Sequence, residues 1–327
     1  NILSQFSIFP FYINAKMEFV IGGAAAVGAG FFTNPLEVLK TRMQLQGELR
    51  AKGQHAVYYK NVLHAGYVVA KNDGILALQK RFSSCTLGST GTQWNEIRLI
   101  TVITYGYFQF ADSRGYTRDR DGNLVFYKTV LSGGFGGVLG QLLSSPLFLI
   151  KTHLQSQSTE AIAVGHQHQH KGFVHALTKI YLKHGVRGLF RGATASIPRA
   201  FFGSIAQLCS FQYAKDYLYT YPYFQDKPLL ISFSGSMVGG VAISIVMTPF
   251  DLVMTRLYNQ PTDTNGKGTL YFSYLDCVRK IYTTEGLSAF YKGVGPMYLR
   301  LGPHSILCLV FWDELQSIYN KYFGQKT

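Results

Sequence analysis

The stretch NPLEVLKTRMQ, residues 34–44, recurs twice in this chain of 327 residues. The second copy is SPLFLIKTHLQ at 145–155, and the third is TPFDLVMTRLY at 248–258. The shared skeleton is a proline, an acid two positions later, and bases five and seven positions later. The prolines are 111 and 103 residues apart. A period near 100 residues indicates three homologous modules.

A second signal follows each motif at a nearly constant distance. Its glycine stands 39, 39 and 37 residues after the motif proline. The three occurrences are Asp73-Gly74, His184-Gly185 and Glu285-Gly286. Each module is therefore expected to contain a long helix, a loop with a short helix, and a second long helix. The short helices are expected near 60–72, 172–183 and 273–284.

Each motif ends a glycine-rich apolar stretch, which favours a helix with a smooth face for close packing. The first long helix is expected at 18–45, the fourth at 193–219 and the sixth at 296–322. A proline removes a backbone donor and kinks a helix. The expected kinks lie at Pro35, Pro146 and Pro249.

Composition favours helices that line a watery cavity. The chain is 47% hydrophobic and 15% charged, yet its mean hydropathy is only +0.08 and it contains no uninterrupted run of 18 apolar residues. Helices wholly surrounded by lipid should be more apolar, whereas polar residues are tolerated where they face water inside a bundle. A soluble helical repeat protein is the alternative.

Most of the net charge of +14 lies in three segments. Residues 42–81, 151–191 and 256–292 together carry 18 basic and six acidic residues. This asymmetry predicts that the three loops share one side of a membrane and the termini the other. The loops also suit anionic lipid head groups such as cardiolipin. No nucleic-acid-binding motif is present, so no nucleic-acid partner is expected.

The triple motif resembles the mitochondrial carrier family, solute carrier family 25, from about Met17 to the C-terminus. The resemblance implies an all-α membrane protein with six transmembrane helices, arranged as three homologous two-helix repeats around a central cavity. It implies a monomeric, multi-pass protein of the mitochondrial inner membrane. The expected repeats are 17–118, 124–222 and 227–323, preceded by a non-family extension at 1–16. Within the family the sequence resembles a group of orphan carriers and the subgroup that carries oxaloacetate and sulfate.

Residues 81–94 depart from the family pattern. Ser, Thr, Gly, Asn and Glu are frequent in 81–99, where the family has a mostly apolar second helix, and lipid does not accept such a density of polar groups. The pattern resumes at Asn95. An altered reading frame or exon boundary would produce this segment.

The resemblance implies a matrix gate where the three motif helices converge. Its charged residues are Glu37, Lys40, Lys151 and Asp251, with Gln44 and Gln155 as braces and Tyr258 in the third copy. Phe148 replaces one acid and Met254 one base. The family's usual order of pairing is expected to join Lys151 to Asp251. It leaves Lys40 and Glu37 without partners.

Arginines inside a membrane bundle predict an anion site, because a buried base is costly and usually functional. Arg199 and Arg300 each stand 14 residues after a second-signal glycine, so they lie at the same depth on symmetric helices. Arg98 is the third candidate. The arginine fork suits carboxylates. His304 and Gln207 share helix faces with Arg300 and Arg199, and His304 is a candidate proton carrier; a packing role for it is the alternative.

The alternating tract His166, His168 and His170 has the look of a metal-binding segment. A solvated polar loop is the favoured interpretation, because no cysteine or carboxylate pair nearby completes a site. No metal site and no cofactor is therefore expected. No nucleophile–base arrangement is visible, so the chain is not expected to be an enzyme.

The favoured function is an antiporter that moves a small anion by alternating access. The anion is expected to be a dicarboxylate or keto acid such as oxaloacetate, or an oxyanion such as sulfate. The atypical segment and the incomplete gate leave open a degenerate carrier that acts as a non-transporting membrane scaffold.

Overall fold

The computed structural model describes residues 15–50, 59–74, 78, 107, 110–111, 114–116, 126–222, 228–264 and 266–323. Its long helices are α2 (Ala15–Leu45), α6 (Phe126–Ser156), α8 (Ala193–Tyr219), α10 (Pro228–Asn259) and α12 (Val294–Phe323). Between them lie α3 (Val62–Asp73), α7 (Phe173–Leu189), α11 (Tyr274–Glu285) and the 3-10 turns η1 (Glu160–Ile162) and η2 (Leu287–Tyr291). The atypical segment 81–94 and Arg98 lie outside the described residues.

The described residues are helical apart from their loops and one isolated bridge between Thr262 and Gly268. The expected all-α class is therefore confirmed for this part of the chain. The predicted fourth helix coincides with α8, and the predicted first and sixth helices agree with α2 and α12 to within three residues. Each motif proline lies inside a continuous helix.

The second-signal glycines end the short helices for a conformational reason. Gly74, Gly185 and Gly286 have φ angles of 86°, 64° and 79°, a region that side chains with a Cβ rarely adopt. At Gly185 the chain breaks the regular geometry of α7, so the short helix of the second loop stops there. The glycine signal therefore marks the same turn in all three modules.

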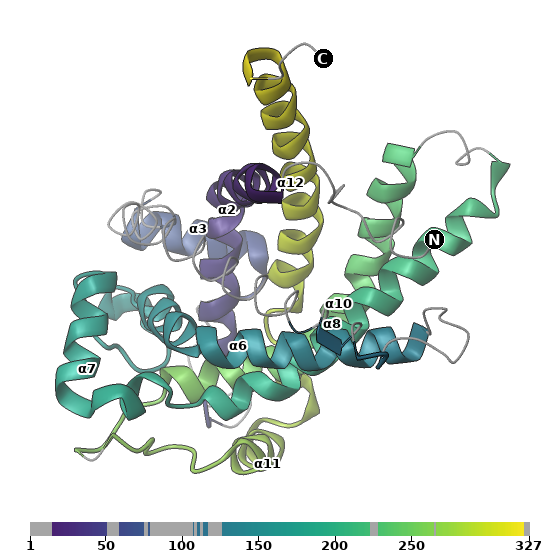
Figure 1. Ribbon diagram of the computed structural model, residues 1–327. Coiled ribbons are helices and arrows are strands. Elements are labelled where there is room, and N and C mark those ends of the chain that lie inside the picture. The colour runs from purple at the N-terminus through teal and green to yellow at the C-terminus, as the bar shows by residue number, and fades with distance from the viewer. Residues whose placement is uncertain are drawn as a thin grey trace.

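The long helices pack side by side in sequence order. α8 contacts α6 and α10, and α12 contacts α10 and α2, as the paired ribbons of α2 and α12 show (Figure 1). The glycine faces permit this approach: a Cβ on Gly28 would lie 3.1 Å from the Phe311 ring, and one on Gly137 would lie 2.6 Å from Ser204 Oγ. The motif helices α2, α6 and α10 also contact one another.

The outer faces of the long helices carry many exposed apolar side chains, as expected where lipid replaces water. Examples are Phe31, Phe32, Phe135, Leu139, Leu143, Val238, Val241, Ile245 and Val310. Within the described residues, the segments Leu131–Ser156 and Met237–Asn259 are long and apolar enough to cross a membrane. α2, α8 and α12 have similar length but carry charged side chains along it.

The three loops meet at the C-terminal ends of the motif helices. Thr159 of the second loop donates to Asp73 of α3 at 2.7 Å, and the backbone N–H of Leu49 donates to Glu285 of α11 at 2.9 Å. These contacts place the basic loops in one layer at one end of the bundle. Which side of the membrane this layer faces stays a prediction.

Candidate anion site and gate

Two ion pairs tie the three motif helices together. Lys40 Nζ on α2 lies 2.7 Å from Asp251 Oδ2 on α10, and Lys151 Nζ on α6 lies 2.8 Å from Glu37 Oε2 on α2. The side chains of Asp251 and Glu37 are only 2% and 7% exposed. The structure thus brings all four predicted charged gate residues into one cluster.

The predicted order of pairing is wrong. Each base reaches the acid of the preceding motif helix in cyclic order, so Lys151 meets Glu37 rather than Asp251. Lys40 and Glu37, expected to be unpaired, both have partners. By the same order, the third ion pair would join the base position 254 to the acid position 148, and these positions hold Met254 and Phe148. Phe148 packs against the buried apolar cluster that contains Met254, so the third pair has become apolar and leaves no orphan charge.

The predicted glutamine braces hydrogen-bond to the gate acids. Gln44 Nε2 donates to Asp251 Oδ2 at 2.9 Å, and Gln155 Nε2 donates to Glu37 Oε2 at 3.2 Å. At the third equivalent position, the Tyr258 hydroxyl lies 2.9 Å from Ser145 Oγ. All three braces therefore cross from one motif helix to another.

Both predicted anion-site arginines are paired with these same acids. Arg199 Nε lies 2.8 Å from Asp251 Oδ1, and Arg300 Nη1 lies 2.6 Å from Glu37 Oε1. One oxygen of each carboxylate thus contacts a lysine and accepts a hydrogen bond from a glutamine, and the other oxygen accepts a hydrogen bond from an arginine. Two acids share four basic side chains, so the cluster has an excess of two positive charges.

Of the other predicted site residues, His304 borders this cluster and interacts electrostatically with Arg300, Glu37 and Lys151. His304 Nδ1 is 3.2 Å from Thr33 Oγ1, and its Nε2 is 3.6 Å from Cys308 Sγ, so both ring nitrogens have neighbours from the bundle. Gln207 is exposed on α8, two turns from Arg199. Its role, like that of Arg98, stays a prediction.

In repeats 1 and 3 an ion pair joins the motif helix to the loop helix of the same repeat. We call this ion pair the clasp. In repeat 1, Arg42 Nη2 lies 2.8 Å from Asp73 Oδ2. In repeat 3, Arg256 binds Glu285 with both terminal nitrogens, at 2.5 and 3.0 Å. Burial raises the pKa of Glu285, but the Arg256 hydrogen bonds and charge, with Lys292, outweigh it and hold that pKa below its ordinary value.

Repeat 2 has histidine at both clasp positions. His153 stands seven residues after its motif proline, like Arg42 and Arg256, and His184 stands where the other repeats have the clasp acid. His153 Nε2 lies 2.9 Å from the Tyr258 carbonyl oxygen of α10. Its Nδ1 is buried and has no hydrogen-bond partner among the described residues.

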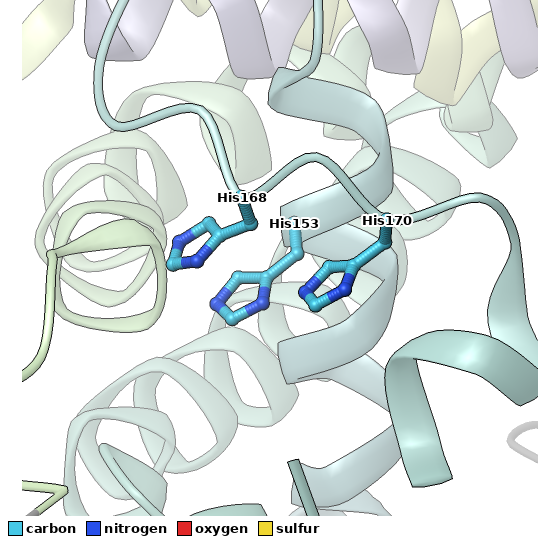
Figure 2. Close-up of side chains that lie close together, drawn as sticks. All are labelled: His153, His168 and His170. Carbon is cyan, nitrogen blue, oxygen red and sulfur yellow. The ribbon is translucent and has the colours of Figure 1, made fainter. Parts of the chain in front are cut away.

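Two loop histidines stack on His153. The ring centroids of His168 and His170 lie 3.5 and 5.5 Å from that of His153, with interplanar angles of 11° and 10°. Figure 2 shows the three rings close together, and the centroids of His168 and His170 lie 5.8 Å apart. Burial lowers the pKa of His168 to about 3 and that of His170 to about 4, so both are neutral near pH 7. We call these three residues the histidine cluster.

Spacing in the sequence grouped His166, His168 and His170 but missed His153. The missing member lies on α6, and only the folded loop brings it beside the tract. A signal was present nonetheless, because His153 interrupts a motif position that is arginine in both other repeats. The sequence therefore shows histidine at the arginine position of the motif, but not that His153 contacts the loop histidines.

Comparison with known proteins agrees with the triple arrangement. The family model described as "Mitochondrial carrier protein" matches residues 14–93, 122–222 and 225–323. The chain is 47% identical over 306 residues to solute carrier family 25 member 35 of Mus musculus, covering 94% of this chain and 99% of the relative.

Two fungal relatives are named for carboxylates. The mitochondrial oxaloacetate transport protein of Saccharomyces cerevisiae is 37% identical, over 92% of this chain and 89% of the relative. The mitochondrial citrate transporter E of Aspergillus niger is 35% identical, over 93% of each. The matched residues and these relatives show that this chain belongs to the mitochondrial carrier family, whose members are multi-pass transporters of the mitochondrial inner membrane and not enzymes.

Proposed function

We propose that this carrier exchanges a small carboxylate or oxyanion by alternating access, with Arg199 and Arg300 as the anion-binding residues. The observation that carries the proposal is that each arginine binds a carboxylate that also helps to hold the motif helices together. The negatively charged oxygens of an incoming anion can replace the carboxylate oxygens of Asp251 and Glu37 as partners of these arginines. Binding and opening are thereby linked.

The link follows from competition for hydrogen bonds. A charge-assisted hydrogen bond contributes about 1.5–3 kcal/mol net. When Arg199 turns to a bound anion, Asp251 loses one of its two ion pairs and keeps Lys40 and Gln44. The closed arrangement is then weaker by that amount. A ligand shifts a conformational equilibrium only by its different affinity for the two states, and this exchange of partners supplies the difference.

The relatives support a carboxylate as substrate. Two of them are named for oxaloacetate and citrate, and arginine binds such groups through two parallel hydrogen bonds. The excess of two positive charges in the cluster suits a divalent anion, which would neutralise it.

Uptake into proteoliposomes tests the proposal. Wild-type protein should take up labelled oxaloacetate, malate or sulfate against an internal anion. Arg199→Ala and Arg300→Ala should each reduce uptake tenfold or more, since about 1.4 kcal/mol is one decade of affinity. Arg300→Lys should be intermediate, because it keeps the charge and loses the fork. Arg187→Ala, on the exposed surface of α7, is the matched control and should transport normally.

The same assay tests the alternative of a non-transporting scaffold. Two complete ion pairs and a matched apolar third pair favour a working gate over a degenerate one. Flat uptake of every anion by folded wild-type protein would favour the scaffold. Normal uptake by both arginine-to-alanine variants would instead refute the anion site while leaving transport intact. The monomeric state and cardiolipin binding by the basic loops stay predictions.

A further inference from the structure

Three positions of repeat 2 hold histidine where repeats 1 and 3 hold other residues. His153 replaces the clasp arginine, and His184 replaces the clasp acid. His170 stands 15 residues before its second-signal glycine, where repeats 1 and 3 have Tyr59 and Tyr271. Each of those tyrosine hydroxyls donates across to a neighbouring repeat, whereas both ring nitrogens of His170 are buried without a partner among the described residues.

We propose that His153, His168 and His170 form a transition-metal site, of the kind that binds Zn²⁺, in place of the missing clasp. One ligand nitrogen from each residue lies within 4.8 Å of the others. A metal bound there would join α6 to the loop before α7, as Arg42–Asp73 and Arg256–Glu285 join motif helix to loop helix in the other repeats.

The hydrogen bonds around the cluster favour metal ligation. His153 Nε2 lies 2.9 Å from the Tyr258 carbonyl oxygen, and His168 Nε2 lies 3.0 Å from that of Asn259. A carbonyl oxygen only accepts, so in each ring Nε2 carries the proton and donates. Nδ1 is then left with a free lone pair. Metal-binding histidines characteristically donate their other ring N–H to such a backbone carbonyl, which fixes the tautomer and orients the ring.

The distances require a modest movement. In a tetrahedral site with Zn–N bonds of about 2.0–2.1 Å, ligand nitrogens lie about 3.4 Å apart. The widest pair must therefore approach by up to about 1.4 Å, and the stacked rings must rotate so that their lone pairs converge. Rotation about the side-chain bonds supplies both changes. His166, whose ring lies edge-on to His168 at 4.6 Å between centroids, or a water molecule would complete four ligands.

A nearby cation tempers the expected affinity. Arg191 Nη2 donates to the same Tyr258 carbonyl at 3.2 Å, so its charge repels a metal ion bound beside His153. We therefore expect binding weaker than in a structural zinc finger, where thiolates neutralise the metal.

Zinc binding to the full chain tests the site. The detergent-purified protein, freed of any histidine tag and stripped with a chelator, is titrated with Zn²⁺ against a competing indicator. One Zn²⁺ should bind per chain, and saturating Zn²⁺ should raise the Tm. His168→Gln and His170→Gln should each weaken binding at least tenfold and reduce the Tm shift. His64→Gln, on the equivalent loop helix of repeat 1, should change neither.

A second pair of measurements guards against misfolded variants. Cu²⁺ bound to wild-type protein should give an electron paramagnetic resonance spectrum with coupling from imidazole nitrogens; a Cu²⁺ spectrum without nitrogen coupling would overturn the site. His153→Arg combined with His184→Asp rebuilds the clasp, so this variant should be stable without Zn²⁺ and gain no Tm from it. Zinc affinity that is unchanged in His168→Gln and His170→Gln would also refute the proposal. None of these readouts depends on transport.

Discussion

Repeat 3 and repeat 2 use different side chains where the motif helix meets its own loop. In repeat 3 the base at the end of the motif helix makes a buried two-point ion pair with the acid that ends the loop helix. In repeat 2 the equivalent residue is His153, which hydrogen-bonds to the Tyr258 carbonyl of the neighbouring repeat, and the position of the clasp acid is His184. The sequence positions correspond, yet repeat 3 holds a two-point ion pair there and repeat 2 holds stacked neutral rings.

The three sectors of the predicted gate also differ from one another. Two sectors consist of an acid with lysine, glutamine and arginine, whereas the third holds Phe148 and Met254. Phe148 has Lys151 and Arg199 at 5.8 and 5.6 Å from its ring centroid, so an aromatic face stands where a carboxylate is missing. Loss of both members of one pair avoids the large penalty of a single buried charge. The repeats therefore vary by whole interactions and not by single residues.

The largest expected effect is loss of the clasp in repeat 3. Glu285→Ala leaves Arg256 buried without its carboxylate, and breaking such a buried pair costs about 3–5 kcal/mol. His184→Ala at the equivalent position of repeat 2 should cost less than about 1 kcal/mol. Thermal unfolding in detergent measures both.

Asp276→Ala provides the control for this comparison. Its ion pair with Lys280 on α11 is partly exposed, and its carboxylate also accepts the exposed Phe272 N–H, so its removal should destabilise far less than Glu285→Ala. Equal destabilisation by Glu285→Ala and His184→Ala would show that the two repeats do not differ as described.

The next effect concerns the apolar third sector of the gate. Met254→Lys places a charge in a buried apolar cluster and should destabilise by about 2–3 kcal/mol. Adding Phe148→Asp rebuilds the third pair, so the double variant should recover at least about 1 kcal/mol relative to the sum of the single changes. Simple additivity in this cycle would mean that positions 148 and 254 are not partners.

A smaller effect is expected from the tyrosines that His170 replaces. The Tyr271 hydroxyl donates to Glu48 at 2.9 Å, and that of Tyr59 donates to the Ile162 carbonyl at 3.1 Å. Tyr271→Phe should cost about 1.5–2 kcal/mol and Tyr59→Phe about 1 kcal/mol, because the bond to a carboxylate is the stronger. The reverse ranking in chemical or thermal unfolding would contradict the assignment.

The last expected effect is a pH dependence to which His168 of repeat 2 contributes. The pKa of His168, about 3, lies below its ordinary value of 6.5 because the ring is buried. The folded state then binds fewer protons than the unfolded state between these values, so stability is complete above pH 6.5 and falls as the pH drops toward 3. At pH 5.5 the loss from His168 should be about 1.4 kcal/mol, because the ring is then mostly protonated in the unfolded state and neutral in the folded state.

His168→Gln should remove the contribution of His168 and leave that of His170, whose lowered pKa of about 4 acts in the same direction. His64→Gln should leave the dependence as it is. The comparison uses Tm values at pH 7.5 and 5.5, with a chelator present so that metal binding does not contribute. An identical pH response in wild type and His168→Gln would show that the ring does not titrate as described.

Much of the fold could be read from the repeat alone. The positions of the short helices, the ends of α8 and the turn at each second-signal glycine follow from local rules, because proline, glycine and helix caps act over a few residues. Asn61 and Ser273, for example, cap α3 and α11 by accepting the N–H of His64 and Asp276. The candidate arginines were also found from depth along symmetric helices.

The pairing of side chains was beyond the sequence. Whether Lys40 turns toward Asp251 or toward position 148 depends on the direction in which three helices cross, and residue spacing within one helix carries no such information. The same is true of Arg199 and Arg300, whose partners are 52 and 263 residues away, and of His153, which meets His168 only when the second loop folds back. The sequence by itself determined which charges and rings each repeat possesses. Tertiary packing decided which of them touch, because contact across helices is set by the arrangement of the whole bundle.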